Sequence, residues 1–237
     1  MKKIVFLSGA GISAESGIST FRDSNGLWEN HDVMEVASIQ GWRRNPGVVL
    51  DFYNERRAQL KEAEPNAAHL AIAGLEKDYK VTVITQNVDN LHERAGSSKV
   101  IHLHGELTKV RPEDSCTEND RYDESRIRDI GYSPVSLGDV DERGVQYRPH
   151  IVFFGESVPK MSEAISELTE ADFMVIVGTS LVVQPAASLW QFTPVGCPVI
   201  VVDPKGTPID GSEDVISIRD KATTGVARAI EIIKSKG

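Results

Sequence analysis

At 237 residues with a formal net charge of −9, the chain is long enough to bury a large core in one domain or two. The acidic balance argues against bulk binding of nucleic acid, and no apolar run approaches the roughly 20 residues of a membrane span. Two cysteines, Cys116 and Cys197, are too few for a disulfide framework or a cysteine-rich zinc site. The basic start precedes an apolar run too short for a signal peptide, so we expect a cytoplasmic protein that binds neither nucleic acid nor membrane.

The apolar run 4–7 predicts a buried strand that leads into Gly9, Gly11 and Ala14 at the spacing of a dinucleotide fingerprint. Glycines there let a phosphate approach the backbone, and a helix start would offer it free N–H groups. The fingerprint also requires an acidic residue about 20 positions on, at the end of a second strand. Glu29 has the right distance, but residues 18–30 read as a polar loop. An ordinary hydride-transferring dinucleotide fold is therefore disfavoured.

Three further runs rich in valine and isoleucine predict buried parallel strands, at 81–85, 173–177 and 199–202. Helical patterns lie between or after them, at 67–77, 160–170 and 223–234. Asn66 is a suitable N-cap for the first of these helices. The alternation predicts an α/β fold, a Rossmann-like doubly wound parallel sheet.

Two stretches do not fit the alternation, 31–65 and 109–149. The first contains a helical pattern over 47–62 after an irregular stretch, and the second is polar and punctuated by proline and glycine. We expect these stretches to form a smaller inserted domain without zinc. The Rossmann-like domain then consists of residues 1–30, 66–108 and 150–237.

Polar side chains follow the second predicted strand, where Gln86, Asn87 and Asp89 stand at its carboxyl end. Ligands of open parallel sheets bind outside these ends. Amide and carboxylate groups suit hydrogen bonding to a carboxamide and to ribose hydroxyls. A helix cap or turn is an equally good interpretation of these three residues alone.

His102 and His104 are two residues apart, so on a strand their side chains share one face. The pair is compatible with a metal site that has no evident third ligand, with a packed histidine pair, or with a general base at His104. Histidine suits base catalysis at neutral pH, and Gly105 would leave room for a substrate.

Two more segments are candidates for binding. Residues 148–156 form an extended segment with a glycine break, which is either an ordinary edge strand or a place where a peptide adds as a strand. Gly178, Thr179 and Ser180 follow a strand and offer small residues and hydroxyls for a phosphate or ribose, or form a simple turn.

In their order along the chain, these segments resemble the motifs of the sirtuins, the NAD-dependent protein lysine deacylases. The matching segments are Gly9-Ala10-Gly11-Ile12-Ser13, Thr20-Phe21-Arg22, Gln86-Asn87-Val88-Asp89, His102-Leu103-His104-Gly105, Phe154-Gly155-Glu156 and Gly178-Thr179-Ser180. The resemblance implies a Rossmann-like domain that carries a small domain, with NAD and the acyl-lysine of a protein substrate meeting in the cleft between them.

The resemblance also implies roles for individual residues. His104 would be the general base, and Asn87 would act beside it as a catalytic residue. The substrate peptide would be clamped by Val152, Phe153, Phe154, Gly155 and Glu156. NAD would be held by Gly9, Ala10, Gly11, Ser13, Ala14, Phe21, Arg22, Trp28, Gln86, Asn87, Asp89, Gly178, Thr179, Ser180, Asp203 and Ala222.

Tyr53 and Arg56 lie three residues apart in a helical pattern and therefore share a face. The sirtuin subgroup that removes succinyl and malonyl groups carries such a Tyr-x-x-Arg pair in its acyl pocket. Arginine offers a bidentate fork to a carboxylate, and tyrosine adds a hydroxyl. The resemblance therefore implies activity on succinyl- or malonyl-lysine besides acetyl-lysine, although a solvated helix face would show the same spacing.

One feature departs from the family pattern. Most sirtuins carry two Cys-x-x-Cys pairs between the His-Gly and Phe-Gly-Glu motifs, where this chain has only Cys116. We therefore predict no metal in the small domain. Two other functions remain open, an NAD-dependent ADP-ribosyltransferase and a non-catalytic module that binds NAD or ADP-ribose. Release of nicotinamide that depends on an acylated peptide would distinguish all three.

Overall fold

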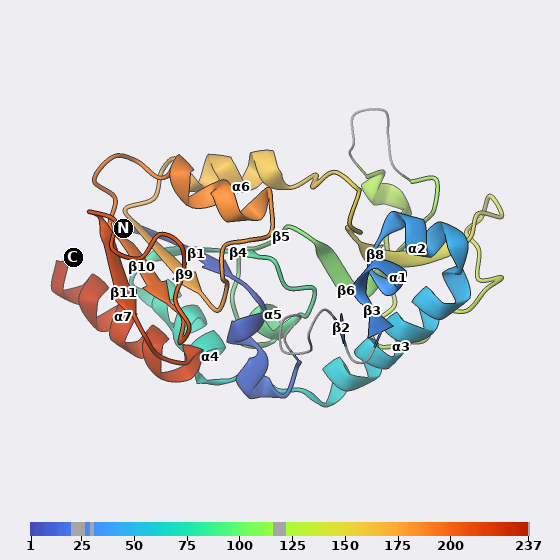
Figure 1. Ribbon diagram of the computed structural model, residues 1–237, viewed down its shortest axis with the longest axis horizontal. Coiled ribbons are helices and arrows are strands. Elements are labelled where there is room, and N and C mark those ends of the chain that lie inside the picture. Colours follow the sequence, from blue (N-terminus) through green and yellow to red (C-terminus); the bar gives the residue numbers. More distant parts are fainter. Residues whose placement is uncertain (20–26, 29–30, 116–121, 237) are drawn as a thin grey trace.

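The computed structural model describes residues 1–19, 27–28, 31–115 and 122–236. Figure 1 shows two units side by side. The parallel-sheet unit, on the left, carries both chain ends. The small unit, on the right, is built mainly from residues 31–62 and 105–151. None of the helices in the described ranges is long and apolar enough to cross a membrane.

Six parallel strands form the large sheet in the order β11-β10-β9-β1-β4-β5. The central strand β1 pairs with β4 on one side and β9 on the other. All four strands predicted from apolar runs are confirmed, and two short ones extend the sheet at its edges. Their bounds are β1 Lys3–Ser8, β4 Lys80–Thr85, β5 Val100–His102, β9 Phe173–Val177, β10 Val199–Val202 and β11 Val215–Ile218.

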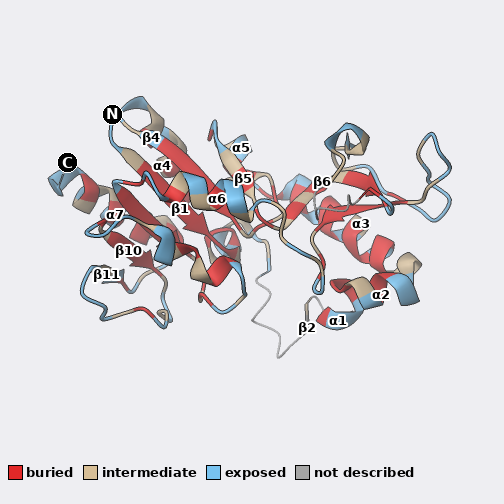
Figure 2. Ribbon diagram, turned by 90° about the horizontal axis from the view of Figure 1, so that it is seen from above, coloured by how far each residue is buried: buried red, intermediate tan, exposed pale blue. Residues whose placement is uncertain are grey.

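Helices cover both faces of this sheet, which is why its central strands are largely apolar. Ile4 and Phe6 pack in one cluster with α4 (Ala67–Gly74) and α7 (Ala222–Lys236). Val5 and Leu7 pack in the opposite cluster with α6 (Met161–Leu168) and the 3₁₀ segment η5 (Ala186–Phe192). Figure 2 shows the buried residues along these strands. The three predicted helices and the doubly wound arrangement are confirmed.

Local sequence sets where these elements begin. Asn66 caps α4 as predicted, since its side chain accepts a hydrogen bond from Ala68 N–H while His69 accepts one from Asn66 N–H. The helix start expected after Gly11 is wrong. The chain instead makes two 3₁₀ turns, η1 (Ala10–Ile12) and η2 (Ala14–Ser16), where the fingerprint places an α-helix.

The small unit has its own apolar core, which includes Trp42, Phe52, Tyr53 and Phe153. The predicted helix over 47–62 is confirmed as α3. The stretch before it, expected to be irregular, instead contains two short helices that Asp32 and Ser38 cap. The elements are α1 Val33–Val36, α2 Ile39–Arg44, α3 Pro46–Glu62, the sheet β7-β6-β8 (Arg128–Asp129, Gly105–Pro112, Tyr147–Ile151) and the hairpin β2 Leu27–Trp28 with β3 His31–Asp32.

An ion cluster holds the polar stretch after β6. The Arg126 guanidinium contacts the carboxylates of Asp114 and Asp141, and Asp141 also accepts hydrogen bonds from the N–H groups of Arg143 and Val145. The hydrogen bond from Arg126 lowers the pKa of Asp141 to about 2. This cluster joins segments on both sides of β7.

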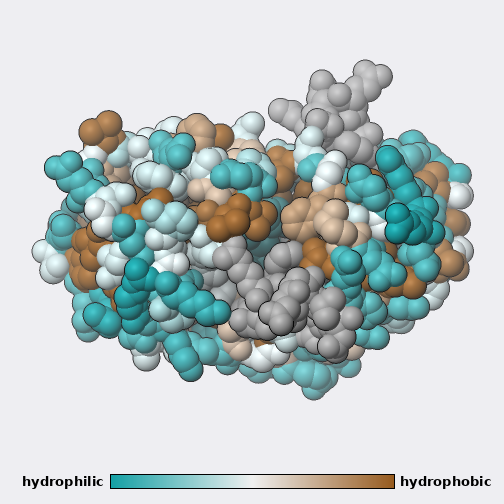
Figure 3. Space-filling view, viewed as in Figure 1, coloured by the Kyte–Doolittle hydropathy of each residue, from teal (hydrophilic) through white to brown (hydrophobic). Residues whose placement is uncertain are grey.

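Figure 3 shows hydrophilic side chains over much of both units on the face seen in Figure 1.

Purified protein is expected to contain far less than stoichiometric zinc, and a chelator should change neither its melting temperature nor its activity. A structural zinc site stabilises the fold directly, so its removal would lower the melting temperature. Elemental analysis and thermal melts with and without chelator test this expectation. Stoichiometric zinc together with a clear drop in melting temperature would contradict it. Among the described residues, no group of three or more His, Cys, Asp or Glu side chains is arranged to hold a metal ion.

Candidate functional site

The residues predicted for the cofactor gather at the carboxyl edge of the large sheet. Gly9 follows β1, Gln86 follows β4, Gly178 follows β9 and Asp203 follows β10. The chain passes from β1 to β4 on one side and returns to β9 on the other, so the switch in strand order lies at β1. A crevice at such a switch is where open α/β sheets bind their ligands.

The two fingerprint glycines pack against the turn after β9. A Cβ on Gly9 would lie 2.7 Å from the Thr179 Cβ, and one on Gly11 would lie 2.7 Å from the Gly178 Cα. Gly178 has a positive φ of 62°, and its own Cβ would lie 2.3 Å from the Ile12 nitrogen. These glycines are therefore required so that the two turns can touch, a reason that the fingerprint did not indicate.

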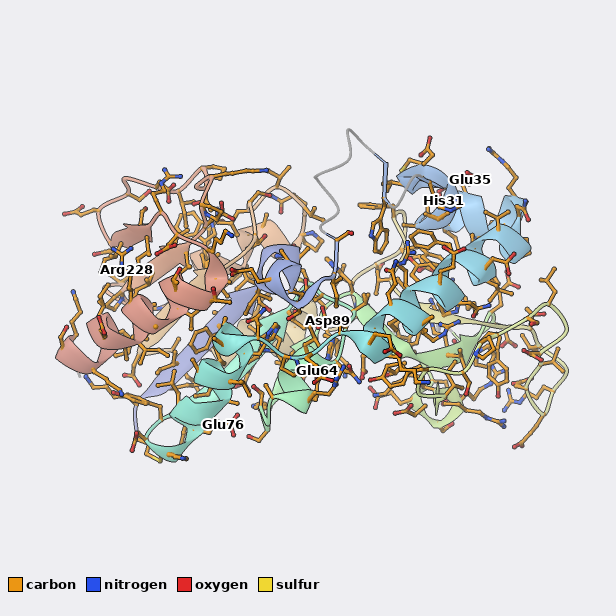
Figure 4. The ribbon with its side chains drawn as sticks, turned by 90° about the horizontal axis from the view of Figure 1, so that it is seen from below. His31, Glu35, Glu64, Glu76, Asp89 and Arg228 are labelled. Atoms are coloured by element: carbon orange, nitrogen blue, oxygen red, sulfur yellow. The ribbon has the colours of Figure 1, made fainter. Side chains whose placement is uncertain are left out.

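A chain of hydrogen bonds joins the β1 and β4 loops. The Asn87 amide donates to the Ser13 hydroxyl at 3.1 Å, and that hydroxyl donates to the Asp89 carboxylate at 2.9 Å. Leu91 N–H also donates to Asp89. Burial raises the pKa of Asp89, against the effect of these two hydrogen bonds. Figure 4 shows Asp89 in the middle of the molecule, where the two units meet.

The other predicted cofactor residues lie along the same edge. The Gln86 amide donates to the Thr179 hydroxyl at 3.0 Å, which joins the β4 and β9 loops. Asp203 accepts hydrogen bonds from Lys205 N–H and Gly206 N–H, so its side chain shapes the turn after β10. Among the rest, Ala10, Ala14 and Ser180 are at least partly accessible, and Ala222 is buried at the start of α7.

His104 follows β5 with one ring nitrogen held. Its Nδ1 lies 3.0 Å from the Gln86 carbonyl oxygen, and a carbonyl only accepts, so Nδ1 carries the proton. The lone pair is then on Nε2, which has no hydrogen-bond partner among the described residues. Burial lowers the pKa of His104, partly offset by the Gln86 bond, so the ring is neutral at neutral pH. Gly105 is required by the close approach of β8, since a Cβ there would lie 2.0 Å from the His150 carbonyl oxygen.

Hydrogen bonds of buried or partly buried side chains hold the predicted peptide-binding segment. Glu156 accepts hydrogen bonds from the buried Arg148 at 2.7 and 2.9 Å and from Phe153 N–H at 2.7 Å. Phe153 is buried, with the Arg148 guanidinium 4.0 Å from its ring centroid. Phe154 is 39% exposed, and its backbone pairs with Ala37 and Ile39. Phe154 and Gly155 therefore form the outer surface, while Phe153 and Glu156 support it.

Val152 joins this segment to the sheet edge that carries His104. Its N–H donates to the His104 carbonyl oxygen at 2.9 Å. The predicted peptide segment and the predicted base are therefore in direct contact, although 48 residues separate them in the sequence.

Tyr53 and Arg56 line one pocket, together with Trp28 and Asp89. Trp28, predicted to bind the cofactor, packs edge-on against Phe52 and Tyr53 at centroid distances of 4.9 and 6.3 Å. The rest of the lining consists of residues that sequence reasoning missed: Ile18, Ser19, Gln59, Leu60, Val88 and Leu107. Gln59 and Leu60 continue the helix face of Arg56, so the helical period could have indicated them, whereas Leu107 comes from β6.

Arg56 has free hydrogen-bonding capacity in this pocket. It is buried, and its Nε and Nη1 have no hydrogen-bond partner among the described residues, while Nη2 reaches Glu55 at 3.4 Å. Burial raises the pKa of Tyr53, so its hydroxyl remains protonated. The pocket therefore offers donors to an anionic group. Phe21 and Arg22, also predicted to bind the cofactor, lie outside the described residues.

Comparisons with known proteins agree with this geometry. A family model described as the Sir2 family matches residues 9–185. An NAD-dependent protein deacylase of Bacteroides thetaiotaomicron is 48% identical over 98% of both chains, and one of Helicobacter pylori is 52% identical over 94% of this chain and 93% of the relative. A Sir2 homologue solved as an NAD complex has a TM-score of 0.85 at 37% identity, covering 99% of this chain and 90% of that one.

Proposed function

Because the chain belongs to the Sir2 family, we propose that its cleft removes acyl groups from lysine side chains of proteins, with nicotinamide and O-acyl-ADP-ribose as products. NAD-dependent protein deacylation is the activity that the related enzymes share by name. The donors and acceptors at the sheet edge fit NAD: amides for a carboxamide, and hydroxyls and a carboxylate for ribose. We assign these contacts to Ser13, Gln86, Asn87, Asp89 and Thr179.

The side chains of this edge have separate tasks in the proposed reaction. NAD, when bound, supplies a ribose carbon that accepts the acyl oxygen while nicotinamide leaves. The Nε2 of His104 accepts a proton from a hydroxyl in the cleft, because Nδ1–H is already held by the Gln86 carbonyl. The Asn87 side chain is oriented by the hydrogen bond that its amide donates to Ser13, and we assign it to the chemical step together with that base. Phe154 and Gly155 carry the peptide.

We further propose that the acyl pocket takes carboxylate-bearing acyl groups such as succinyl and malonyl. The observation that supports this is Arg56, which lines the pocket with two buried N–H positions and no partner for either among the described residues. A buried donor without a partner costs about 1–3 kcal/mol, and a ligand carboxylate would remove that cost. Tyr53 stands beside it as a second donor.

One experiment tests the function as a whole. The protein is incubated with NAD and with an acetyl-peptide or a succinyl-peptide, and the products are identified by mass spectrometry. Deacylated peptide and nicotinamide should appear together, and only when the peptide is acylated. ADP-ribose attached to protein would indicate an ADP-ribosyltransferase. Binding without nicotinamide release would indicate a non-catalytic module.

A cytoplasmic location stays a prediction from the sequence.

The rate of deacylation is expected to fall at acidic pH, with an inflection below about 6.5, because His104 must be neutral to act as a base. Its pKa is lowered by burial, so the neutral form persists below the ordinary range and is lost only as pH falls through the lowered value. Turnover at saturating substrate, measured from acid to neutral pH, tests this. An acid-side inflection clearly above 6.5 would contradict it.

A further inference from the structure

His102 and His104 hold two successive carbonyl groups of the loop after β4. The Nδ1 of His104 lies 3.0 Å from the Gln86 oxygen, and the Nδ1 of His102 lies 3.1 Å from the Asn87 oxygen. Carbonyls only accept hydrogen bonds, so both rings carry a proton on Nδ1. The two rings differ at Nε2, which in His104 is free among the described residues. In His102 it is bound to a carboxylate.

That carboxylate is Glu93, in the short helix α5 (Leu91–Arg94), with its Oε1 2.7 Å from His102 Nε2. The His102 side chain is 7% exposed and that of Glu93 is 40% exposed. Burial lowers the pKa of His102, but the hydrogen bond and charge of Glu93 outweigh it, and the pKa is raised. The charge of Glu106 on β6 raises the pKa of His102 further. Asp89 and His92 also interact electrostatically with this ring. A carbonyl and an ionised carboxylate both only accept, so His102 donates from both nitrogens.

These hydrogen bonds fix the backbone of Asn87. Its N–H is held by the Thr85 hydroxyl at 3.0 Å, and its carbonyl is held by His102, so the peptide groups on both sides are fixed. With both fixed, the side chain leaves the backbone in one direction, toward the Ser13 hydroxyl at 3.1 Å.

We propose that His102, held by Glu93, is a positioning residue that fixes Asn87 for the chemical step through the Asn87 carbonyl. This inference rests on the proposed function, in which Asn87 works beside His104. Because the Glu93 side chain is 40% exposed, its carboxylate stays hydrated when the ring is replaced, and the main cost is the lost hydrogen bond at the Asn87 carbonyl. A leucine at position 102 is therefore expected to fold.

Three variants separate the two hydrogen bonds of the ring. The amide nitrogen in His102→Asn can occupy the place of Nδ1 and keep the bond to Asn87, whereas that in His102→Gln can occupy the place of Nε2 and keep only the bond to Glu93. His102→Leu keeps neither. We expect kcat for deacylation to fall about tenfold or more in the Gln and Leu variants, while the Asn variant stays near wild type and KM for the peptide is unchanged throughout.

Other outcomes would overturn the proposal. Wild-type kcat in His102→Leu would mean that the bond to Asn87 does not matter for the reaction. An equal loss in all three variants, with a lower melting temperature and a higher KM, would mean that the ring acts by packing alone.

A spectroscopic measurement keeps the inference separate from the proposed function. Nitrogen NMR of the imidazoles in wild-type protein should show both nitrogens of His102 protonated at neutral pH. The Asn87 side-chain amide signal should move in the Leu variant and stay in the Asn variant. A His102 ring without a proton on Nδ1 would overturn the inference even in an active enzyme. The expected signals in a protein without deacylase activity would leave the positioning intact and refute the function.

Discussion

Replacing His104 with alanine is expected to lower the rate of NAD-dependent deacylation roughly 10²–10⁴-fold, the usual effect of losing a general base. The ring is held at Nδ1 by the Gln86 carbonyl, and its Nε2 has no partner among the described residues. Alanine removes the lone pair of this Nε2 from the sheet edge. Steady-state turnover on an acetyl-peptide measures the loss.

The control measurements for this variant are NAD affinity and melting temperature, neither of which depends on the chemical step. Affinity for NAD, by calorimetry, and the melting temperature should remain close to wild type, since the His104 side chain makes only one hydrogen bond within the described chain. A variant that kept more than half of wild-type turnover would refute the base assignment. A fall in melting temperature that matched the loss of activity would instead indicate a structural role.

Changing Tyr53 to phenylalanine together with Arg56 to methionine is expected to lower desuccinylation far more than deacetylation. Acetyl has no carboxylate and gains nothing from the two donors. Hydrogen bonds to charged groups contribute about 1.5–3 kcal/mol, so the ratio of the two kcat/KM values should shift by about tenfold or more. Competition between acetyl- and succinyl-peptides in one mixture reports that ratio directly.

Two further variants sharpen the test of acyl choice. Arg56→Lys keeps the charge but not the fork, so it should retain only part of the preference for succinyl groups. Arg43→Met removes an exposed arginine from α2 of the same unit and should leave the ratio unchanged. An equal loss of both activities in the double variant would show that Tyr53 and Arg56 support the unit and do not select the acyl group.

Much of the large sheet could be predicted from the sequence because its strands are buried on both faces. Their valine- and isoleucine-rich runs, such as 173–177, are therefore clear signals of buried strands. The edge strand β11 was missed, since Val215–Ile218 is short and includes an exposed serine. The helix expected after Gly11 failed for another reason. The fingerprint spacing is local, while the fold of the turn depends on Gly178, which is distant in the sequence.

The small unit was harder to predict from the sequence because charged residues form part of its interior. Arg111 and Arg148 are almost fully buried and share the carboxylate of Glu156. A sequence gives such residues no apolar signature, and their partner is known only once β6 and β8 are paired. The sheet β7-β6-β8 was therefore anticipated only at β8, where residues 148–156 were predicted to be extended.

Most of the candidate site was predictable as residues but not as an arrangement. The motifs after β1, β4 and β9 named Ser13, Asn87 and Thr179, and the sheet brings their loops together. Trp28, predicted to bind the cofactor, packs on Phe52 and Tyr53 beside the proposed acyl pocket. That contact joins a hairpin to α3, which no spacing in the sequence shows.

The contact between Val152 N–H and the His104 carbonyl places the proposed base at a junction between the two units. The chain leaves the parallel-sheet unit for β6 directly after His104 and returns from β8 at Val152, so two of its crossings meet there. In a rigid rotation about that point, displacement grows with distance from the axis. The tip of α2 would sweep far while the imidazole barely moved. A rotation of the small unit about this contact would therefore leave the proposed proton acceptor nearly in place.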